Sequence, residues 1–528
     1  MKRIISAILT VTMVLSLASC TAKTEKKTRS SDDQIEETES TEETKKKKKT
    51  KPSSPAPSAT SGIIDDEDLT ELGEKLSKLD NVLFIRPLKT FIPDSYDPEG
   101  YEVVFERPLD PDDYSKGTFE LHVSFCFTGY DVPNVFNCSG YGWETDIEYA
   151  NEGLSGSYCQ CNCISTEYRF FGHSAPYGLD YAGTDYWECL TLENAASDFH
   201  FVIEQFKTIL TGKWCFTGGS KGGEATLFQS MYYPEDADVF YAISAPVKFS
   251  TEDPGIAQYL YEKIGDDMYG VVEAQNMRDS VLKLQVELIE HRDEYEEKFI
   301  EHEKKQHKKV IEAVEDEHLL YDVEVFMMGF GLWQQSSSVL FGYVYNIESI
   351  VEIASIEDED ERLESAFNLL CSVSDDPIKY TPYWSLYPYN IQDCTQTNIF
   401  QMDFSYIREE LRKDGCEDAL YVTEDMEETA CARCMLTDEQ FELFPYDPTA
   451  NEELKKHLET TDCQIIATYG TADVWCGCAI DGIDNPNVHV YKFKGEGHEC
   501  MRITSEMKDV LEKYYAPYDP ISISYFDF

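Results

Sequence analysis

One short segment constrains the fold of this chain more than any other. Residues Lys213–Thr217 are mostly aromatic or β-branched, and they run directly into Gly218-Gly219-Ser220-Lys221-Gly222. Helix-compatible residues follow from Ala225 to Met231. A strand that turns directly into a helix is the unit of a parallel α/β sheet, and glycines on both sides of the serine avoid clashes where strand and helix nearly touch. The sequence therefore predicts such a sheet, with Ser220 exposed on a tight turn.

Other segments complete this sheet. They are short, rich in β-branched or aromatic residues and bounded by Gly, Pro or Asp, as buried strands are. Thr191–Leu210 has apolar residues at helical spacing before the central strand. We expect the segments up to about residue 127 to form an antiparallel edge. The predicted strands are Phe119–Phe127, Asn134–Cys138, Ile164–Phe171, Lys213–Thr217, Val239–Ser244, Cys463–Tyr469 and His489–Phe493.

Residues 251–445 have a different character. Long helical stretches are expected at Ile256–Glu317, Phe326–Val344 and Ile347–Leu370, between two strands of the sheet. We therefore predict a helical lid inserted into a core made of residues 63–250 and 446–528. A coiled coil is the alternative for residues 280–318, but the heptads are too irregular to favour it.

The N-terminal segments predict export. Residues 1–20 have a positive start, a short apolar run and the ending Leu17-Ala18-Ser19-Cys20, which is similar to a bacterial lipobox. Lipidation of Cys20 would anchor the protein on the extracellular face of the bacterial cell membrane, and an ordinary cleaved signal is the alternative. Residues 21–62 are polar and rich in Lys and Pro, so we expect a disordered tether.

Charge and cysteine content limit the partners. After residue 62 lie 33 of the 45 Lys and Arg and 92 of the 100 Asp and Glu, a formal charge of −59. Such a body would repel nucleic acid. Of the 17 cysteines, 16 follow Cys20, and this even number suggests disulfides in an exported chain, with free thiols as the alternative. Zinc at Cys159-x-Cys161-x-Cys163 or Cys431-x-x-Cys434 is disfavoured because neither has a nearby His, so no metal is expected.

The chemistry is predicted from Ser220 and two residues that follow it. G-x-S-x-G between a strand and a helix is the pattern of a nucleophile turn in α/β-hydrolases, whose acid and histidine come later in the chain. Asp473 lies in the loop after the strand ending at Tyr469, and His498 lies in a Gly-flanked loop after the last strand. The predicted triad is nucleophile Ser220, base His498 and orienting Asp473. The other histidines precede Ser220 or lie in charged helices or strands.

Two backbone N–H groups are predicted to stabilise the reaction's oxyanion. The N–H of Lys221 directly follows the nucleophile. The second candidate is the N–H of Tyr141, in Asn137-Cys138-Ser139-Gly140-Tyr141-Gly142, although an ordinary turn would also explain these glycines. The His-Gly-Gly-Gly motif that many lipases carry is absent.

Six blocks of the chain form a recognisable set: Asn137–Gly142, Glu167–Pro176, Leu190–Asp198, Gly212–Gly223, Tyr321–Gln334 and Tyr469–Trp475. These blocks resemble the secreted bacterial tripeptidyl aminopeptidases and, more distantly, the prolyl carboxypeptidase and dipeptidyl peptidase group. The resemblance spans roughly residues 75–510 and implies an α/β-hydrolase with a helical lid, a serine exopeptidase acting on peptides with a free N-terminus, and no cofactor. By motif match the triad again falls on Ser220, Asp473 and His498. Departures are cysteines at Cys138, Cys476, Cys478 and Cys500 and a longer, more acidic lid.

Substrate-binding residues are predicted less directly. An aminopeptidase needs a carboxylate for the substrate ammonium, and Glu167 is the candidate, with a structural ion pair to Arg169 or another cation as the alternative. Trp475 and Trp333 are candidates for lining the cleft, with core packing as the alternative. Two other functions stay open, a carboxylesterase or lipase on the same fold and a non-catalytic surface lipoprotein. The sequence gives no indication of the oligomeric state.

Overall fold

In the computed structural model, the described residues form one compact unit within Ile63–Phe528. The predicted signal, the tether and Cys20 lie outside the described residues. Within those residues, no helix is both long enough and apolar enough to cross a membrane. The structure describes residues 69–90, 98–143, 147–150, 161–176, 186–250, 255–306, 311, 314–337, 346–374, 386–399, 402–434, 442, 445–500 and 502–516.

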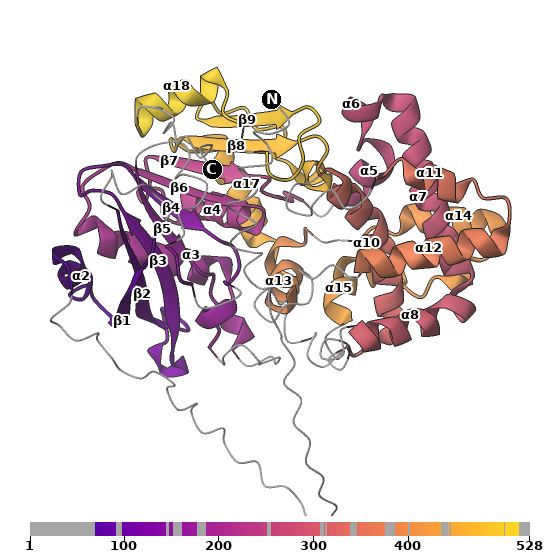
Figure 1. Ribbon diagram of the computed structural model, residues 1–528, viewed down its shortest axis with the longest axis horizontal. Coiled ribbons are helices and arrows are strands. Elements are labelled where there is room, and N and C mark those ends of the chain that lie inside the picture. The colour runs from indigo at the N-terminus through magenta and orange to yellow at the C-terminus, as the bar shows by residue number, and fades with distance from the viewer. Residues whose placement is uncertain are drawn as a thin grey trace, which may run out of the picture. The chain divides into compact units, whose positions relative to one another are not determined.

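A nine-stranded sheet, in the order β1-β2-β3-β5-β4-β6-β7-β8-β9, forms the core (Figure 1). Strands β1, β2, β3 and β5 pair antiparallel, which confirms the predicted antiparallel edge. From β5 to β9 all neighbours are parallel. The strands are β1 Val82–Leu88, β2 Glu99–Pro108, β3 Thr118–Phe127, β4 Asn134–Cys138, β5 Asn162–Thr166, β6 Trp214–Gly219, β7 Val239–Ile243, β8 Ile465–Gly470 and β9 Val488–Phe493.

The predicted strands are present, with one clear shortening. The segment predicted as Ile164–Phe171 leaves the sheet after Thr166. Phe170 takes a φ of 71°, a left-handed conformation that interrupts an extended chain. The residues after Thr166 therefore form a loop at the edge of the sheet, where the candidate site lies.

Helices cover both faces of the sheet because successive strand residues point to opposite sides. Phe216 packs in the cluster with helices α3 (Leu192–Lys207), α4 (Lys221–Tyr232) and α17 (Thr449–Thr460). Its neighbour Cys215 packs in the cluster with α18 (Ser505–Tyr514) on the other side. This three-layer arrangement, with a mostly parallel sheet and an antiparallel edge, is an α/β-hydrolase fold.

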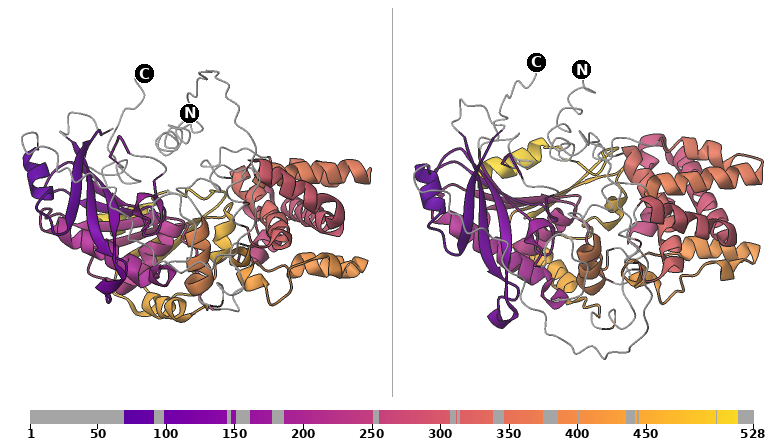
Figure 2. Two further views of the ribbon diagram at one scale, coloured as in Figure 1. Left: turned by 90° about the horizontal axis from the view of Figure 1, so that it is seen from below. Right: turned by 60° about the horizontal axis from the view of Figure 1, so that its bottom comes forward.

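A helical insertion lies between β7 and β8. Its predicted first helix, Ile256–Glu317, is broken, because Gly265 and Gly270 have φ values of 88° and 85°. Helix α7 packs against α5, α10, α11, α12 and α14, so the insertion is a helical cluster and not a coiled coil (Figure 2). The insertion helices are α5 Gly255–Glu262, α6 Asp266–Tyr269, α7 Val271–Glu290, α8 Arg292–Gln306, α10 Glu317–Ser337, α11 Ser349–Ala354, α12 Glu359–Ser374, α13 Leu386–Gln392, α14 Ser405–Asp414 and α15 Ala430–Arg433. Helix α2 (Glu71–Leu76) precedes the sheet.

One segment of the insertion packs with the sheet, and one segment that follows a strand of the sheet packs with the insertion. Helix α13 and the π-helical turn η9 (Asp393–Thr397) place Tyr389, Ile391 and Cys394 in the core of the sheet. Conversely, the short helix η12 (Val474–Cys478) after β8 packs in the helical cluster. The predicted lid, residues 251–445, thus includes the segment of α13 and η9, which packs in the hydrolase core. The boundaries of the predicted domains stay predictions.

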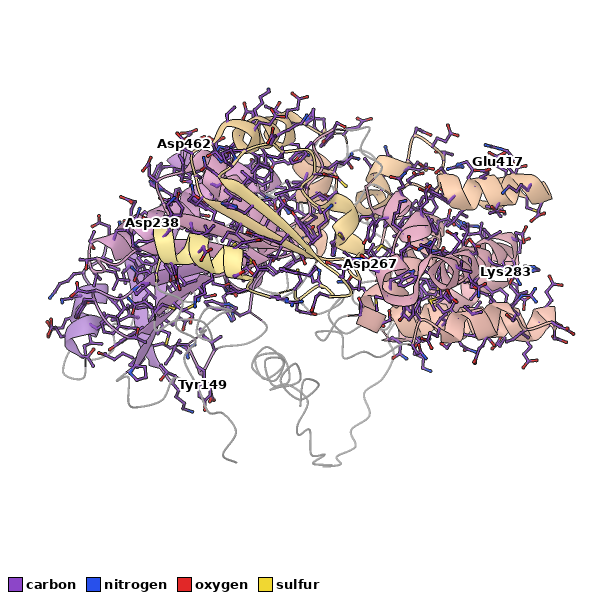
Figure 3. All side chains as sticks on the ribbon, turned by 90° about the horizontal axis from the view of Figure 1, so that it is seen from above. Tyr149, Asp238, Asp267, Lys283, Glu417 and Asp462 are labelled. Atoms are coloured by element: carbon purple, nitrogen blue, oxygen red, sulfur yellow. The ribbon has the colours of Figure 1, made fainter. Side chains whose placement is uncertain are left out.

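Contacts at the carboxyl ends of β8 and β9 fix the insertion further. The Ser337 hydroxyl donates to the Ala472 carbonyl at 2.8 Å, and the Tyr259 hydroxyl donates to the Thr471 carbonyl at 2.9 Å. Asp267, labelled in Figure 3, forms a 2.8 Å ion pair with Lys494 in the loop after β9. The helical cluster is therefore attached to the two loops that carry Asp473 and His498.

Candidate active site

Ser220 lies at the turn between β6 and α4 with a φ of 55° and a ψ of −124°. A non-glycine residue rarely adopts this region, so the surrounding contacts must enforce it. Its N–H donates to the Ile243 carbonyl at 2.8 Å. A Cβ on Gly218 would lie 2.4 Å from the Gly222 backbone, and a Cβ on Gly222 would lie 2.3 Å from the Cys138 carbonyl oxygen, so both positions require glycine. The turn holds Ser220 where the sequence pattern predicts a nucleophile.

Asp473 and His498 form a hydrogen-bonded pair. Asp473 is fully buried, and its Oδ2 lies 2.8 Å from Nδ1 of His498. Its other oxygen, Oδ1, accepts from the Trp475 N–H at 3.2 Å as the cap of η12. These contacts fix both carboxylate oxygens, so the imidazole has a defined orientation.

The end of β7 brings the serine turn and the histidine loop together. Ile243 accepts the hydrogen bond from Ser220, and the next residue, Ser244, donates its hydroxyl to the His498 carbonyl at 2.7 Å. Because β6, β7, β8 and β9 are adjacent and parallel, their carboxyl ends meet at one edge. The structure thus gathers Ser220, Asp473 and His498 at that edge.

The pKa of His498 is set by opposing effects. Burial lowers it, but the charge of Asp473 and the hydrogen bond to that carboxylate raise it more, with a smaller contribution from Glu499. The net pKa lies above the ordinary value of 6.5. The Asp473 pair therefore makes His498 a stronger proton acceptor than an isolated imidazole.

The two oxyanion candidates have different surroundings. Lys221 is the first residue of α4, so its N–H belongs to the helix turn whose donors have no acceptor within the helix. The Tyr141 N–H instead donates to Ser139 Oγ at 3.2 Å. The Tyr141 phenol, however, lies near the Ser220 side chain, which lowers the phenol's pKa less than burial raises it. Burial raises the phenol's pKa, so it keeps its proton. The hydroxyl of Tyr141, not foreseen from the sequence, faces the serine.

The Glu167 carboxylate is fully buried and already has partners. Oε1 accepts from the Trp143 N–H at 2.7 Å, and Oε2 accepts from the Ser174 N–H and hydroxyl at 2.8 and 2.9 Å. Arg169, the expected ion-pair partner, instead binds Asp198 at 2.8 Å. These contacts tie two loops beside the site together and favour a structural role for Glu167.

The two tryptophans pack in the helical cluster. Trp475 is 6% exposed and its ring meets Phe330 edge-on at 5.2 Å. Trp333 is 1% exposed and packs near Tyr269, with ring centroids 6.4 Å apart. Both positions favour core packing, the alternative stated above for each.

Cysteines and possible metal ligands add no catalytic group. Cys138, Cys476 and Cys500 are free thiols, not members of disulfides. One group of potential metal ligands is found among the described residues, His200, Glu204 and Asp236. Lys207 forms ion pairs with both carboxylates there, at 3.2 and 3.9 Å, and supplies the positive charge that a cation would bring.

The site also contains residues that the sequence did not single out. Tyr168, Glu224, Tyr389 and Gln392 are buried around the side chain of Lys221. Glu224, four residues after Ser220 on α4, could have been noticed in the sequence, because a carboxylate is rarely buried without a partner on a helix that packs against a sheet. Gln392 offered none, since it lies 171 residues from Lys221 in sequence.

Comparison with known proteins identifies the family of this chain. The profile of the family described as PS-10 peptidase S37 matches residues 80–415, which include Ser220 and end before Asp473. The chain is 24% identical over 390 residues to the prolyl tri/tetrapeptidyl aminopeptidase of Streptomyces mobaraensis, covering 72% of this chain and 71% of that protein.

Solved structures match over shorter stretches. The acetyl xylan esterase from Paenibacillus sp. R4 is 13% identical, with a TM-score of 0.22, over 33% of this chain and 56% of that one. Candida antarctica lipase A in its closed state is 12% identical, with a TM-score of 0.22, over 39% and 50%. The chain thus spans about half the length of these two structures. Because the family profile covers well over half of the chain, the protein belongs to the PS-10 peptidase S37 family and is a serine peptidase.

Proposed function

We propose that this protein is a serine exopeptidase that removes short peptides, chiefly tripeptides, from the free N-termini of peptide substrates. The observation that carries the proposal is the convergence on β7, where Ile243 holds the Ser220 turn and Ser244 holds the loop of His498. This arrangement supports Ser220 as nucleophile, His498 as base and Asp473 as the residue that orients His498.

In the proposed acylation step, the Ser220 oxygen attacks the carbonyl carbon of the scissile peptide bond. The serine proton moves to Nε2 of His498, while Asp473 accepts a hydrogen bond from the Nδ1–H of the same ring. The carbon–nitrogen bond then breaks, and His498 gives the proton to the leaving amine. Water hydrolyses the resulting ester, with His498 again accepting and returning a proton, and the short peptide leaves with a new carboxylate.

Negative charge develops on the carbonyl oxygen in both steps. The Lys221 N–H is one proposed donor to it. The proximity of the Tyr141 phenol to the Ser220 side chain supports the Tyr141 hydroxyl as the second donor. It would take the place of the Tyr141 backbone N–H, which donates to Ser139 Oγ.

The substrate class rests on the relative and on charge. The name of the Streptomyces protein specifies tri- and tetrapeptides released from an N-terminus. A formal charge of −59 after residue 62 favours approach of a substrate that carries an ammonium group. Both support peptides with a free amine over N-blocked peptides or neutral esters.

A substrate panel tests this proposal. Fluorophore release would be measured from a free-amine tripeptide amide, its N-acetylated twin and a short acyl ester, with wild type and Ser220→Ala. Ser220-dependent cleavage of the free-amine peptide alone is expected. Cleavage of the ester only, or of both peptides equally, would contradict the proposal and favour a general serine hydrolase.

Glu167→Gln separates the two roles open to Glu167. Its buried hydrogen bonds predict a lower melting temperature and an unchanged preference for the free-amine peptide. A selective loss of that preference, with unchanged stability, would instead identify Glu167 as the ammonium anchor.

Localisation is a separate proposal, based on Leu17-Ala18-Ser19-Cys20 and the polar segment that follows. The mature protein would be held on the extracellular face of the bacterial membrane by acyl chains on Cys20. Cys20→Ala is expected to abolish incorporation of labelled palmitate, whereas Cys416→Ala, at an exposed free thiol, should not. Equal incorporation in both variants would contradict lipidation at Cys20.

A further inference from the structure

The side chain of Lys221 is buried beside the nucleophile, although it carries an ammonium group. It is 1% exposed, and Nζ lies over the rings of Tyr168 at 4.1 Å, Tyr389 at 5.0 Å and Phe171 at 5.9 Å. Aromatic faces attract a cation but do not replace the hydrogen bonds it loses on leaving water. The ammonium group therefore depends on a hydrogen-bond acceptor inside the protein.

Gln392, at the end of α13, provides that acceptor. Nζ of Lys221 donates to Oε1 of Gln392, and Nε2 of Gln392 donates to the Tyr168 hydroxyl at 3.0 Å. Gln392 is 1% exposed, so no water competes for either contact. Both ends of the amide are thus committed to groups around Ser220.

The turn η9, directly after Gln392, is fixed on the hydrolase core. Gln396 Oε1 accepts from the Leu192 N–H at 2.8 Å, at the start of α3. The Thr397 carbonyl accepts from Asn451 Nδ2 of α17, also at 2.8 Å. Tyr389, one turn before Gln392, meets the Tyr141 ring edge-on at 5.9 Å. The element that holds Lys221 therefore also packs against Tyr141.

The groups around Lys221 act on its pKa in opposite directions. Burial lowers the pKa of Lys221, while Glu224 on α4, Cys138 on β4 and Asp393 on η9 oppose that shift. Burial raises the pKa of Glu224 to about 7, although Lys221 acts against it. Within the described part of the chain, Oε2 of Glu224 has no hydrogen-bond partner, so this oxygen does not replace Gln392 as the acceptor for Lys221.

We propose that Gln392 is a positioning residue for the nucleophile turn, which acts by holding the Lys221 side chain in place. Without this acceptor, the Lys221 side chain would move toward water. Because Lys221 directly follows Ser220, this movement would rotate the peptide unit that carries the Lys221 N–H. The inference rests on the proposed function, which assigns that N–H to the oxyanion. The insertion thereby contributes a residue to the catalytic machinery across 171 positions of sequence.

Gln392→Leu tests this, with Gln396→Leu as the matched control, because Gln396 also holds this segment to the core but does not contact Lys221. We expect Gln392→Leu to lower kcat and the rate of Ser220 labelling by a fluorophosphonate about 10-fold or more, a fraction of the loss of a whole oxyanion donor. KM should stay within about twofold, since the change affects the transition state. Gln396→Leu should stay near wild type in both. Equal effects of the two variants, or a change in KM alone, would overturn the inference.

A second variant separates positioning from a general loss of folding. Lys221→Met keeps the backbone N–H and removes the buried charge, so Gln392→Leu should cost much less activity in this background than alone. Additive losses in the double variant would show that Gln392 does not act through Lys221.

The outcomes distinguish this inference from the proposed function. If wild type is neither labelled at Ser220 nor active on the free-amine peptide, the proposed function itself fails. If wild type is active in a Ser220-dependent way and Gln392→Leu matches Gln396→Leu, only the positioning role fails.

Discussion

Replacing Asp473 by Asn isolates the role of one carboxylate oxygen. Oδ1 accepts from the Trp475 N–H at 3.2 Å, while Oδ2 faces Nδ1 of His498 at 2.8 Å. An Asn can keep the first contact with its carbonyl oxygen. Its amide then donates toward Nδ1, which places the imidazole proton on Nε2, the atom that must accept the serine proton. The substitution therefore preserves the loop and selects the wrong tautomer of His498.

The expected loss combines two effects. A hydrogen bond to a charged group contributes about 1.5–3 kcal/mol. Losing it in the transition state alone slows the reaction about 10- to 100-fold. The wrong tautomer adds to this, and the corresponding exchange in a serine triad costs about 10⁴-fold in kcat. We expect kcat of Asp473→Asn to fall by about 10²- to 10⁴-fold.

The assay is hydrolysis of the free-amine tripeptide amide at saturating substrate, with thermal unfolding measured in parallel. The control is Asp462→Asn, an exposed carboxylate before β8 that Figure 3 labels. It should leave kcat unchanged. A loss below about 10-fold for Asp473→Asn, with an unchanged melting temperature, would refute the view that this carboxylate orients His498.

Three further predictions follow from the site. Tyr141→Phe should lower kcat by about 10²-fold with little change in KM, as expected for the loss of an oxyanion donor; an unchanged kcat would exclude the phenol from that role. Activity should rise with pH through a pKa above 6.5, because the neutral form of His498 accepts the proton and Asp473 raises its pKa; a pH–rate profile of kcat/KM whose acid limit lies below 6.5 would contradict this. Gly218→Ala should destabilise the protein by more than about 1 kcal/mol, because its Cβ would lie 2.4 Å from Gly222, whereas Gly219→Ala, with its nearest atom at 3.9 Å, should not; equal melting temperatures for the two would show that the turn can relax.

The sequence by itself determined the elements that depend on local pattern. The residues that gave α3 its helical spacing are all buried, and β4 spans the predicted Asn134–Cys138. In α3 these residues are Leu192, Ala196, Phe199, Ile203 and Phe206. The order serine, acid, histidine was also visible, because each residue follows a strand with a recognisable local signature. Such signals are contained within a few residues, so no distant part of the chain is needed to detect them.

Only the tertiary structure decided which partners the side chains near Ser220 contact. The contacts of Glu167 with Trp143 and Ser174 commit its carboxylate to two loops. Lys221 is the first residue of α4 and could have pointed to solvent, but Gln392 and aromatic rings bury it. Each outcome depends on contacts between segments far apart in the chain, which local periodicity does not encode. The packing of Tyr389 and Ile391 of α13 in the hydrolase core has the same cause.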